Sequence, residues 1–286
     1  MKLKNIKYYL QIIKPGIVFG NLITFSSCFI FASKGNINLN LFFFTFFSLF
    51  LIISGSCVLN NIIDISIDKN MTRTKNRALV IKKISIVYAW FYSYLLLFLG
   101  FIIMFYFVNF FSFFLSFLGF FIYIFLYSLY LKKKSIFSIF IGSISGAMPP
   151  IIGYYSACKK LDLNFLLFFI IFFLWQIPHF YIISIFRIKD YKNAKIPILP
   201  LKKDIFFTVC MISLCIFFFT IFSNLFYLYN FSLNKFFIFS TLINFFWLFF
   251  TLLAYFYKNN KIFYFSFLIS IFSNFITSFF IAIHYM

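Results

Sequence analysis

The sequence predicts an all-α, polytopic integral membrane protein with about nine transmembrane helices. Three observations support this fold class. Hydrophobic residues make up 64% of the 286 residues, and the mean hydropathy is +1.03. Charged residues are only 10% of the chain, whereas they are roughly a quarter of an ordinary soluble domain. Apolar stretches of about 20 residues, the length that crosses the hydrocarbon layer, recur along the chain. A disordered chain is excluded because such chains are poor in apolar residues.

The predicted spans lie at residues 16–33, 41–63, 84–108, 110–131, 136–157, 163–186, 205–229, 233–257 and 262–284. We expect them to form one transmembrane domain, residues 1–286, around a central cavity that the two long polar loops cap. Asn109 alone separates the third and fourth spans, which predicts a tight helical hairpin. Pro149 and Pro150 predict a break near the middle of the fifth span, since proline lacks the backbone donor. Gly142 and Gly146 permit close helix approach there.

The distribution of positive charge predicts the orientation. An amphipathic lysine-bearing stretch precedes the first span, which is expected to be retained because no signal-peptide cleavage pattern follows it. With nine spans, the N-terminus and the loops 64–83, 132–135, 187–204 and 258–261 share one side, which carries 21 of the 25 Lys and Arg residues. The positive-inside rule makes that side cytoplasmic. We therefore expect a multi-pass protein of the cell inner (cytoplasmic) membrane with its N-terminus and long loops in the cytoplasm.

The net charge of +20 does not indicate a nucleic-acid partner. Most of it follows from topology and from contact with the anionic lipid heads of the bilayer. The five cysteines are expected to pack as apolar side chains, because no pair has CxxC spacing. With two His in the chain, a dedicated zinc site is not expected.

Acidic residues are rare, and three polar side chains at the end of the second span form a pattern. Asn60, Asp64 and Asp68 are spaced at i, i+4 and i+8, so they share one helical face, with Asn61 beside it. Carboxylates are costly within a membrane and two of them one turn apart repel, but a divalent cation removes both penalties. Mg²⁺ is typically bound by one or two carboxylates plus substrate phosphates. We predict a Mg²⁺ site on this face; a solvated helix end with intrahelical ion pairs is the alternative.

All three arginines of the chain lie in the two long polar loops, at Arg73, Arg77 and Arg187. Lys replaces Arg almost everywhere else in this sequence. A retained guanidinium therefore indicates a geometric need, such as bidentate contact with phosphate. Acids that can hold Mg²⁺ thus stand beside bases that can hold phosphate.

Residues 60–68, which read Asn-Asn-x-x-Asp-x-x-x-Asp, resemble the first aspartate motif of the UbiA-type intramembrane prenyltransferases. Residues 73–77, Arg-Thr-Lys-Asn-Arg, are similar to one branch of that family, the protoheme IX farnesyltransferases (heme O synthases). Other blocks that agree, in order, are Lys14-Pro15-Gly16, Gly20-Asn21-Leu22, the segment 142–153, Trp175-Gln176-x-Pro178-His179, the segment 186–191 and the segment 196–200. The resemblance covers roughly residues 8–204.

The resemblance implies transfer of a farnesyl group from farnesyl diphosphate to a vinyl group of protoheme IX (heme B), giving heme O and diphosphate, with Mg²⁺ required. Heme A synthase or terminal oxidase assembly would use the product. Ionisation of the allylic C–O bond puts negative charge on the diphosphate, so metal and cationic side chains should stabilise it. An apolar cavity should shield the carbocation from water.

The resemblance also implies roles for individual residues. Asp64, Asp68 and Asp190 are implied to be catalytic, and Asn60, Asp64 and Asp68 to bind the metal. Substrate contacts are implied for Asn60, Asn61, Arg73, Arg77, Tyr127, Lys132, Arg187, Lys189 and Tyr191. A topogenic role of the charge is the alternative for Lys132. Many members have a second aspartate four residues after the first in the later loop, but this chain has Ala194, which argues against a second metal there. Asp190 then completes the first site, orients Arg187 or Lys189, or forms a structural ion pair.

His179 follows Pro178 inside the sixth span, where the proline should kink the helix. Irregular backbone within a membrane is tolerated where it faces protein or a cavity. Imidazole binds heme iron, so His179 is a candidate heme contact. A hydrogen-bonded packing role is the alternative for this histidine.

Two other functions are compatible with the general pattern. One is a prenyltransferase that acts on an aromatic quinone precursor, against which the blocks in the fifth and sixth spans argue. The other is a multi-span secondary transporter. Transporters often show repeated halves with sites at the midplane, whereas the acids of this chain cluster at one end of the spans.

Overall fold

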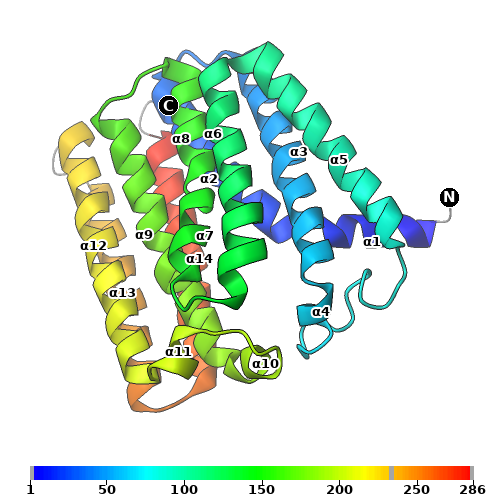
Figure 1. The fold of residues 1–286 in the computed structure, drawn as a ribbon. Coiled ribbons are helices and arrows are strands. Elements are labelled where there is room, and N and C mark those ends of the chain that lie inside the picture. Colours follow the sequence, from blue (N-terminus) through cyan, green and yellow to red (C-terminus); the bar gives the residue numbers. More distant parts are fainter. Residues whose placement is uncertain (1–2, 232–234, 284–286) are drawn as a thin grey trace.

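The computed structural model describes residues 3–231 and 235–283, and within them every regular element is a helix (Figure 1). The predicted all-α fold is confirmed. The predicted start of the eighth span at residue 233 and the end of the ninth at residue 284 lie outside the described residues.

In the described part of the chain, eight helices are long and apolar enough to cross a membrane. They are α2 (Pro15–Ser33), α3 (Leu39–Ile63), α5 (Ile86–Ile103) continued by the π-helix η1 (Met104–Val108), α6 (Phe110–Phe121) continued by the π-helix η2 (Ile122–Tyr130) and the 3-10 helix η3 (Leu131–Lys133), α9 (Leu163–Phe186), α12 (Ile205–Phe231), α13 (Lys235–Phe256) and α14 (Asn260–Ala282). The remaining predicted span, the fifth, is present as two shorter helices, α7 (Ser138–Gly146) and α8 (Met148–Cys158).

The break in the fifth span occurs where the sequence predicts it, since α7 ends at Gly146 and α8 starts just before the two prolines. The glycines of α7 also allow the predicted close approach. A Cβ atom on Gly146 would lie 2.1 Å from Gln176 Oε1 of α9, and one on Gly142 would lie 3.2 Å from the ring of Tyr127. The predicted hairpin is present as well, because Asn109 is extended and its side chain caps α6.

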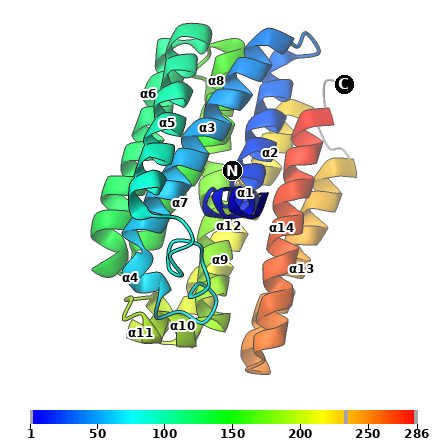
Figure 2. The same cartoon turned by 90° about the vertical axis from the view of Figure 1, so that its right-hand side faces the viewer.

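The two long polar loops lie at one end of the bundle (Figures 1 and 2). The loop after α3 contains α4 (Ile65–Asp68), and the loop after α9 contains α10 (Ile188–Asn193) and α11 (Leu199–Lys202). The short connections around residues 34–38, 109 and 159–162 lie at the opposite end (Figure 1). The basic and the weakly charged loops thus occupy opposite ends, as the count of spans predicts.

The N-terminal helix α1 (Leu3–Ile12) lies across the spanning helices: it is horizontal in Figure 1 and seen end-on in Figure 2. Ile12 and Ile13 are buried in a small core with residues of α3 and the following loop. The rings of Tyr9 and Tyr92 meet edge to face at 5.2 Å. Lys14 has a left-handed backbone, with φ 55°, so the chain turns sharply between α1 and α2. This turn brings the side chain of Lys14 to the acidic end of α3.

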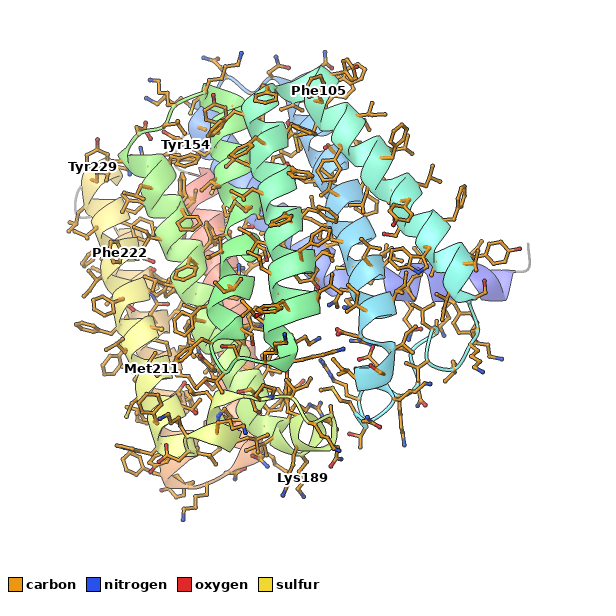
Figure 3. All side chains as sticks on the ribbon, viewed as in Figure 1. Phe105, Tyr154, Lys189, Met211, Phe222 and Tyr229 are labelled. Atoms are coloured by element: carbon orange, nitrogen blue, oxygen red, sulfur yellow. The ribbon has the colours of Figure 1, made fainter. Side chains whose placement is uncertain are left out.

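Both the interior and the outer surface of the bundle are apolar. Phe25 and Phe168 are completely buried, whereas Phe91 and Phe110 are each 67% exposed. Aromatic side chains cover the outside of the spanning helices (Figure 3). A water-soluble domain rarely exposes so large an apolar surface, but lipid contacts it readily. Four of the five cysteines are at least partly buried as predicted; Cys210 is exposed on α12.

Candidate active site

The polar face at the end of the second span continues across a helix junction. α3 ends at Ile63 and α4 begins at Ile65, yet the amide of Asp64 donates to Asn60 O at 2.9 Å and the amide of Asp68 donates to Asp64 O at 2.8 Å. The i, i+4, i+8 spacing therefore keeps its helical geometry. Asn60, Asp64 and Asp68 are buried, with exposed fractions of 3%, 2% and 4%.

Each carboxylate of this face forms an ion pair with a cation from another segment. Arg77 Nη1 lies 2.6 Å from Asp68 Oδ2, and Lys132 Nζ pairs with Asp64 Oδ2. No further ion pair occurs among residues 3–231 and 235–283. The structure thus brings two predicted phosphate-binding residues, Arg77 and Lys132, to the predicted metal-binding acids.

Lys14 is a third cation at this site. Its Nζ donates to Asn60 Oδ1, while Asn60 Nδ2 donates to Ser128 Oγ at 2.9 Å. Burial, helped by the nearby charges of Arg77 and Lys132, lowers the pKa of Lys14 to about 8. The sequence shows Lys14 only as part of a motif and assigns it no role; its contact with a residue 46 positions away has no sequence signature.

α1 closes one side of the site. Asn61 Nδ2 donates to Ile12 O at 2.6 Å, and Arg77 Nη1 also donates to Asn61 Oδ1 at 3.2 Å. A small pocket of about 10 Å³, with room for about one water molecule, lies at this junction, lined by Gln11, Ile12, Asn61, Asp68, Arg77 and Leu79. Asn61 therefore ties the acidic face to α1 and also lines the pocket.

The π-helix η2 orients the residues of the fourth span toward the acids. Its wider turn lets Ser128 Oγ donate to Tyr123 O, five residues earlier, at 2.8 Å. The rings of Tyr123 and Tyr127 stack with centroids 6.0 Å apart, and Lys132 Nζ lies 6.0 Å from the centroid of Tyr127. Such π-helical turns occur frequently at functional sites. The predicted residues Tyr127 and Lys132 are thus both on the acidic side of this span.

Asp190 connects the two long loops. The amide and the hydroxyl of Thr72 donate to Asp190 Oδ1 at 2.8 Å and 2.6 Å. Burial alone would raise the pKa of Asp190, but these hydrogen bonds and the charge of Arg187 lower it below its usual value. The structure thus gives Asp190 a partner, Thr72, that the sequence did not indicate, and its hydrogen bonds do not run to Asp64 or Asp68.

The other predicted residues of the loops differ in exposure. Tyr191 is partly buried, and burial, reinforced by the Tyr127 hydroxyl, raises the pKa of its phenol. The guanidinium of Arg187 lies 5.4 Å from the centroid of the ring of Phe186. Arg73 and Lys189 are exposed, and Lys189 lies at the outer edge of α10 (Figure 3). The structure does not bring the side chains of Arg73 and Lys189 into contact with the acids.

His179 lies in the contact between α9 and α14. Its Nδ1 is 2.6 Å from Ser270 Oγ. The centroid of its ring lies 4.8 Å from that of the Trp175 ring and 4.9 Å from that of the Phe267 ring. The indole of Trp175 donates to Ser270 O at 2.8 Å. These contacts match the packing role, and a contact with heme stays a prediction.

The acidic face suits a magnesium ion that also binds a substrate. Asp64 Oδ1 is buried and accepts no hydrogen bond, so one carboxylate oxygen lacks a partner. Two carboxylates and an amide oxygen form a hard oxygen donor set, which Mg²⁺ prefers. Among the described residues, no group of three or more His, Cys, Asp or Glu side chains could hold a metal ion. Further ligands would have to come from water or a bound substrate.

Comparison with known sequences identifies close similarities. The model of the UbiA prenyltransferase family matches residues 21–278. The protoheme IX farnesyltransferase of Cronobacter sakazakii is 45% identical over 200 residues, which cover 70% of this chain and 68% of that protein. The protein of the same name from Sodalis glossinidius is 44% identical over 211 residues, 74% of this chain and 71% of that protein.

Solved structures share the fold at low sequence identity. A digeranylgeranylglyceryl phosphate synthase structure has a TM-score of 0.76 at 17% identity, covering 96% of this chain and 99% of that chain. A UbiA homolog from Archaeoglobus fulgidus bound to GPP and Mg²⁺ has a TM-score of 0.66 at 16% identity, with the same coverage of 96% and 99%. Identity at this level shows the fold alone.

Proposed function

The chain belongs to the UbiA prenyltransferase family, and on this premise we propose that it transfers a farnesyl group from farnesyl diphosphate to a vinyl group of protoheme IX, giving heme O and diphosphate. The observation that carries this proposal is the identity of 44–45% to proteins named protoheme IX farnesyltransferase over more than two thirds of their length. The buried acids and their cationic partners are the groups that such a reaction needs.

The site residues divide into metal-binding and phosphate-binding groups. Asn60, Asp64 and Asp68 would hold Mg²⁺, which when bound supplies positive charge to the departing diphosphate. A family member bound to GPP and Mg²⁺ supports this choice of metal. Arg77 and Lys132 would donate to phosphate oxygens, where charge-assisted hydrogen bonds are strongest.

The reaction then needs charge stabilisation at the diphosphate and control of where water enters. The electron pair of the allylic C–O bond leaves with the diphosphate, and the vinyl π electrons form the new bond to the farnesyl carbon. A water molecule then adds to the cation left on the other vinyl carbon and loses a proton, which gives the hydroxyl group of the product. Tyr127, Tyr191 and Arg187 would complete the diphosphate end, with Arg73 and Lys189 at its rim. The apolar interior of the bundle would shield the carbocation.

The acceptor and the cellular setting follow from the same proposal. His179 would contact the heme from the α9–α14 side. The protein would be in the cell inner membrane, with the N-terminus and both long loops in the cytoplasm; the position of 21 of the 25 basic residues on that side supports this. Heme A synthase or terminal oxidase assembly would take up the product.

The direct test is product analysis. Membranes containing the expressed chain are incubated with farnesyl diphosphate, protoheme IX and Mg²⁺, and porphyrins are separated and identified by mass. Heme O should form, disappear on chelation of the metal and return when Mg²⁺ is restored. Prenylation of an aromatic quinone precursor instead of heme would show that the acceptor is wrong, and the absence of any prenylated product would overturn the proposal.

A further inference from the structure

Each side chain proposed as a metal ligand is already engaged by a cationic side chain. Lys132 pairs with Asp64, Arg77 pairs with Asp68, and Lys14 donates to the third ligand, an asparagine. These cations come from three separate segments: η3, the loop after α4, and the junction of α1 and α2. The positions that a metal ion would contact are thus held by the protein's own positive charges.

The charges at this site do not balance. Three cations meet two carboxylates, and the partner of Lys14 is the neutral amide of Asn60. Lys14 is partly buried, and a charge held partly out of water without a counter-ion is unfavourable. A metal ion entering alone would add two positive charges to this surplus and would compete with Lys132 and Arg77 for the carboxylates. An anion entering alone would meet the buried carboxylates of Asp64 and Asp68.

The number of available ligands also indicates that a metal ion does not bind well to this face alone. Mg²⁺ prefers six oxygen ligands in near-ideal octahedral geometry and usually keeps several waters. The face offers two carboxylates and one amide oxygen, and one of the carboxylate oxygens, Asp64 Oδ1, is buried without a partner. The protein therefore supplies a metal ion with too few ligands unless an anionic substrate enters with it.

Building on the proposed function, we propose that the divalent metal and the diphosphate bind as a coupled pair, because Lys14 and Lys132 act as internal placeholders for the metal. When both ligands enter, Asn60, Asp64 and Asp68 would hold the metal, and the two ammonium groups would be free to donate to the phosphate oxygens. Lysine is suited to this exchange because its compact charge sits on a flexible four-carbon stem.

The exchange predicts opposite effects of one substitution on two ligands. In Lys132→Met, Asp64 loses its placeholder, so metal alone should bind more tightly; the diphosphate loses a donor, so it should bind more weakly. Allosteric and linked-site couplings are commonly 5–150-fold, and we expect a change of about tenfold in each direction. Lys14→Met should act in the same two directions with a smaller effect, since its partner is neutral.

The measurement uses the full chain in lipid nanodiscs. Mn²⁺ alone, which suits the same oxygen ligands, is titrated and followed by electron paramagnetic resonance. Inorganic pyrophosphate is then titrated at saturating Mg²⁺ and followed by calorimetry. Lys133→Met is the matched control: it removes the same charge from the next residue of η3, but Lys133 is exposed and has no carboxylate partner. It should leave both affinities unchanged.

Mn²⁺ affinity in Lys132→Met that equals the control, or falls below it, overturns the placeholder role. Circular dichroism and size-exclusion chromatography establish whether each variant is folded. If Lys132→Met is not folded, the Mn²⁺ affinities of Lys14→Met and Lys132→Arg test the proposal instead. The arginine variant keeps a cation and should bind Mn²⁺ alone as weakly as the wild type. The heme O assay separates the two proposals. Heme O formation without the opposite shifts leaves the function standing, and the shifts without heme O leave the coupled site standing.

Discussion

The two carboxylate oxygens of Asp64 have different surroundings. One of its oxygens pairs with Lys132, and the other is buried without a hydrogen-bond partner. A buried charge is tolerated only when it is paired or coordinates a metal, and Lys132 supplies that pairing here. Asp68 differs, because Arg77 reaches both it and Asn61 and fixes it within a network.

We expect Asp64→Asn and Asp68→Asn each to lower heme O formation by at least about 100-fold, the scale seen when one electrostatic contact to a transition state is removed. Asn keeps the shape of Asp but loses the negative charge that would hold a metal. The initial rate in membranes, normalised to protein content, measures this. Asp204→Asn is the control: Asp204 is exposed and caps α12, and Asn caps equally well. Equal rates for all three variants would contradict the assignment.

The fold depends on close contact between α2 and α8. A Cβ atom on Gly153 would lie 2.3 Å from the carbonyl oxygen of Phe25, which is backbone and cannot rotate away. The two helices would have to separate, and α8 is the second half of the broken fifth span. A helix that approaches so closely holds the break in a fixed position beside the rest of the bundle.

Gly153→Ala should therefore destabilise the protein by about 1–3 kcal/mol, as overpacking does in other cores. The measurement is the midpoint of thermal unfolding in detergent. Gly20→Ala on α2 is the matched control, since an added Cβ there meets nothing within 4 Å. A midpoint for Gly153→Ala equal to that of Gly20→Ala would show that the helices adapt.

The elements also show what a sequence can predict. Spans, the break at the prolines and the acidic face follow from hydrophobicity, proline chemistry and helical spacing, all of which are local. The bond from Thr72 to Asp190 joins residues 118 positions apart, and Lys14 reaches Asn60 through a left-handed turn. Such contacts depend on how helices pack, so no local pattern indicates them. The π-helix η2 was also not expected, because its hydrophobic sequence suits an ordinary α-helix equally well.

At the scale of the whole molecule, charge and topology agree. Both long basic loops lie at the end of the bundle that carries the acidic site, and the weakly charged connections lie at the other end (Figure 1). The proposed diphosphate site would therefore face the side on which water-soluble phosphates are found. The apolar outer surface leaves the bundle free to sit in lipid along its whole length.

The proposed orientation predicts which side reacts with an impermeant maleimide. In a Cys158→Ala, Cys210→Ala background, Lys160→Cys should be labelled in intact spheroplasts, because Lys160 is exposed in the connection after α8. Lys195→Cys, exposed in the loop after α10, should be labelled only after the membrane is permeabilised. Labelling is read by mass shift on a gel. The reverse pattern would place the long loops outside the cytoplasm.

The site also has a consequence for how the protein is made. Every group of the acidic face and its cationic partners, from Lys14 to Lys132, is encoded before the midpoint of the chain. Four spans are sufficient to deliver them, whereas the α9–α14 contact around His179 waits for the synthesis of α14. The acidic face can assemble while synthesis continues, and the packing around His179 forms later. The order of translation thus separates these two groups of contacts in time.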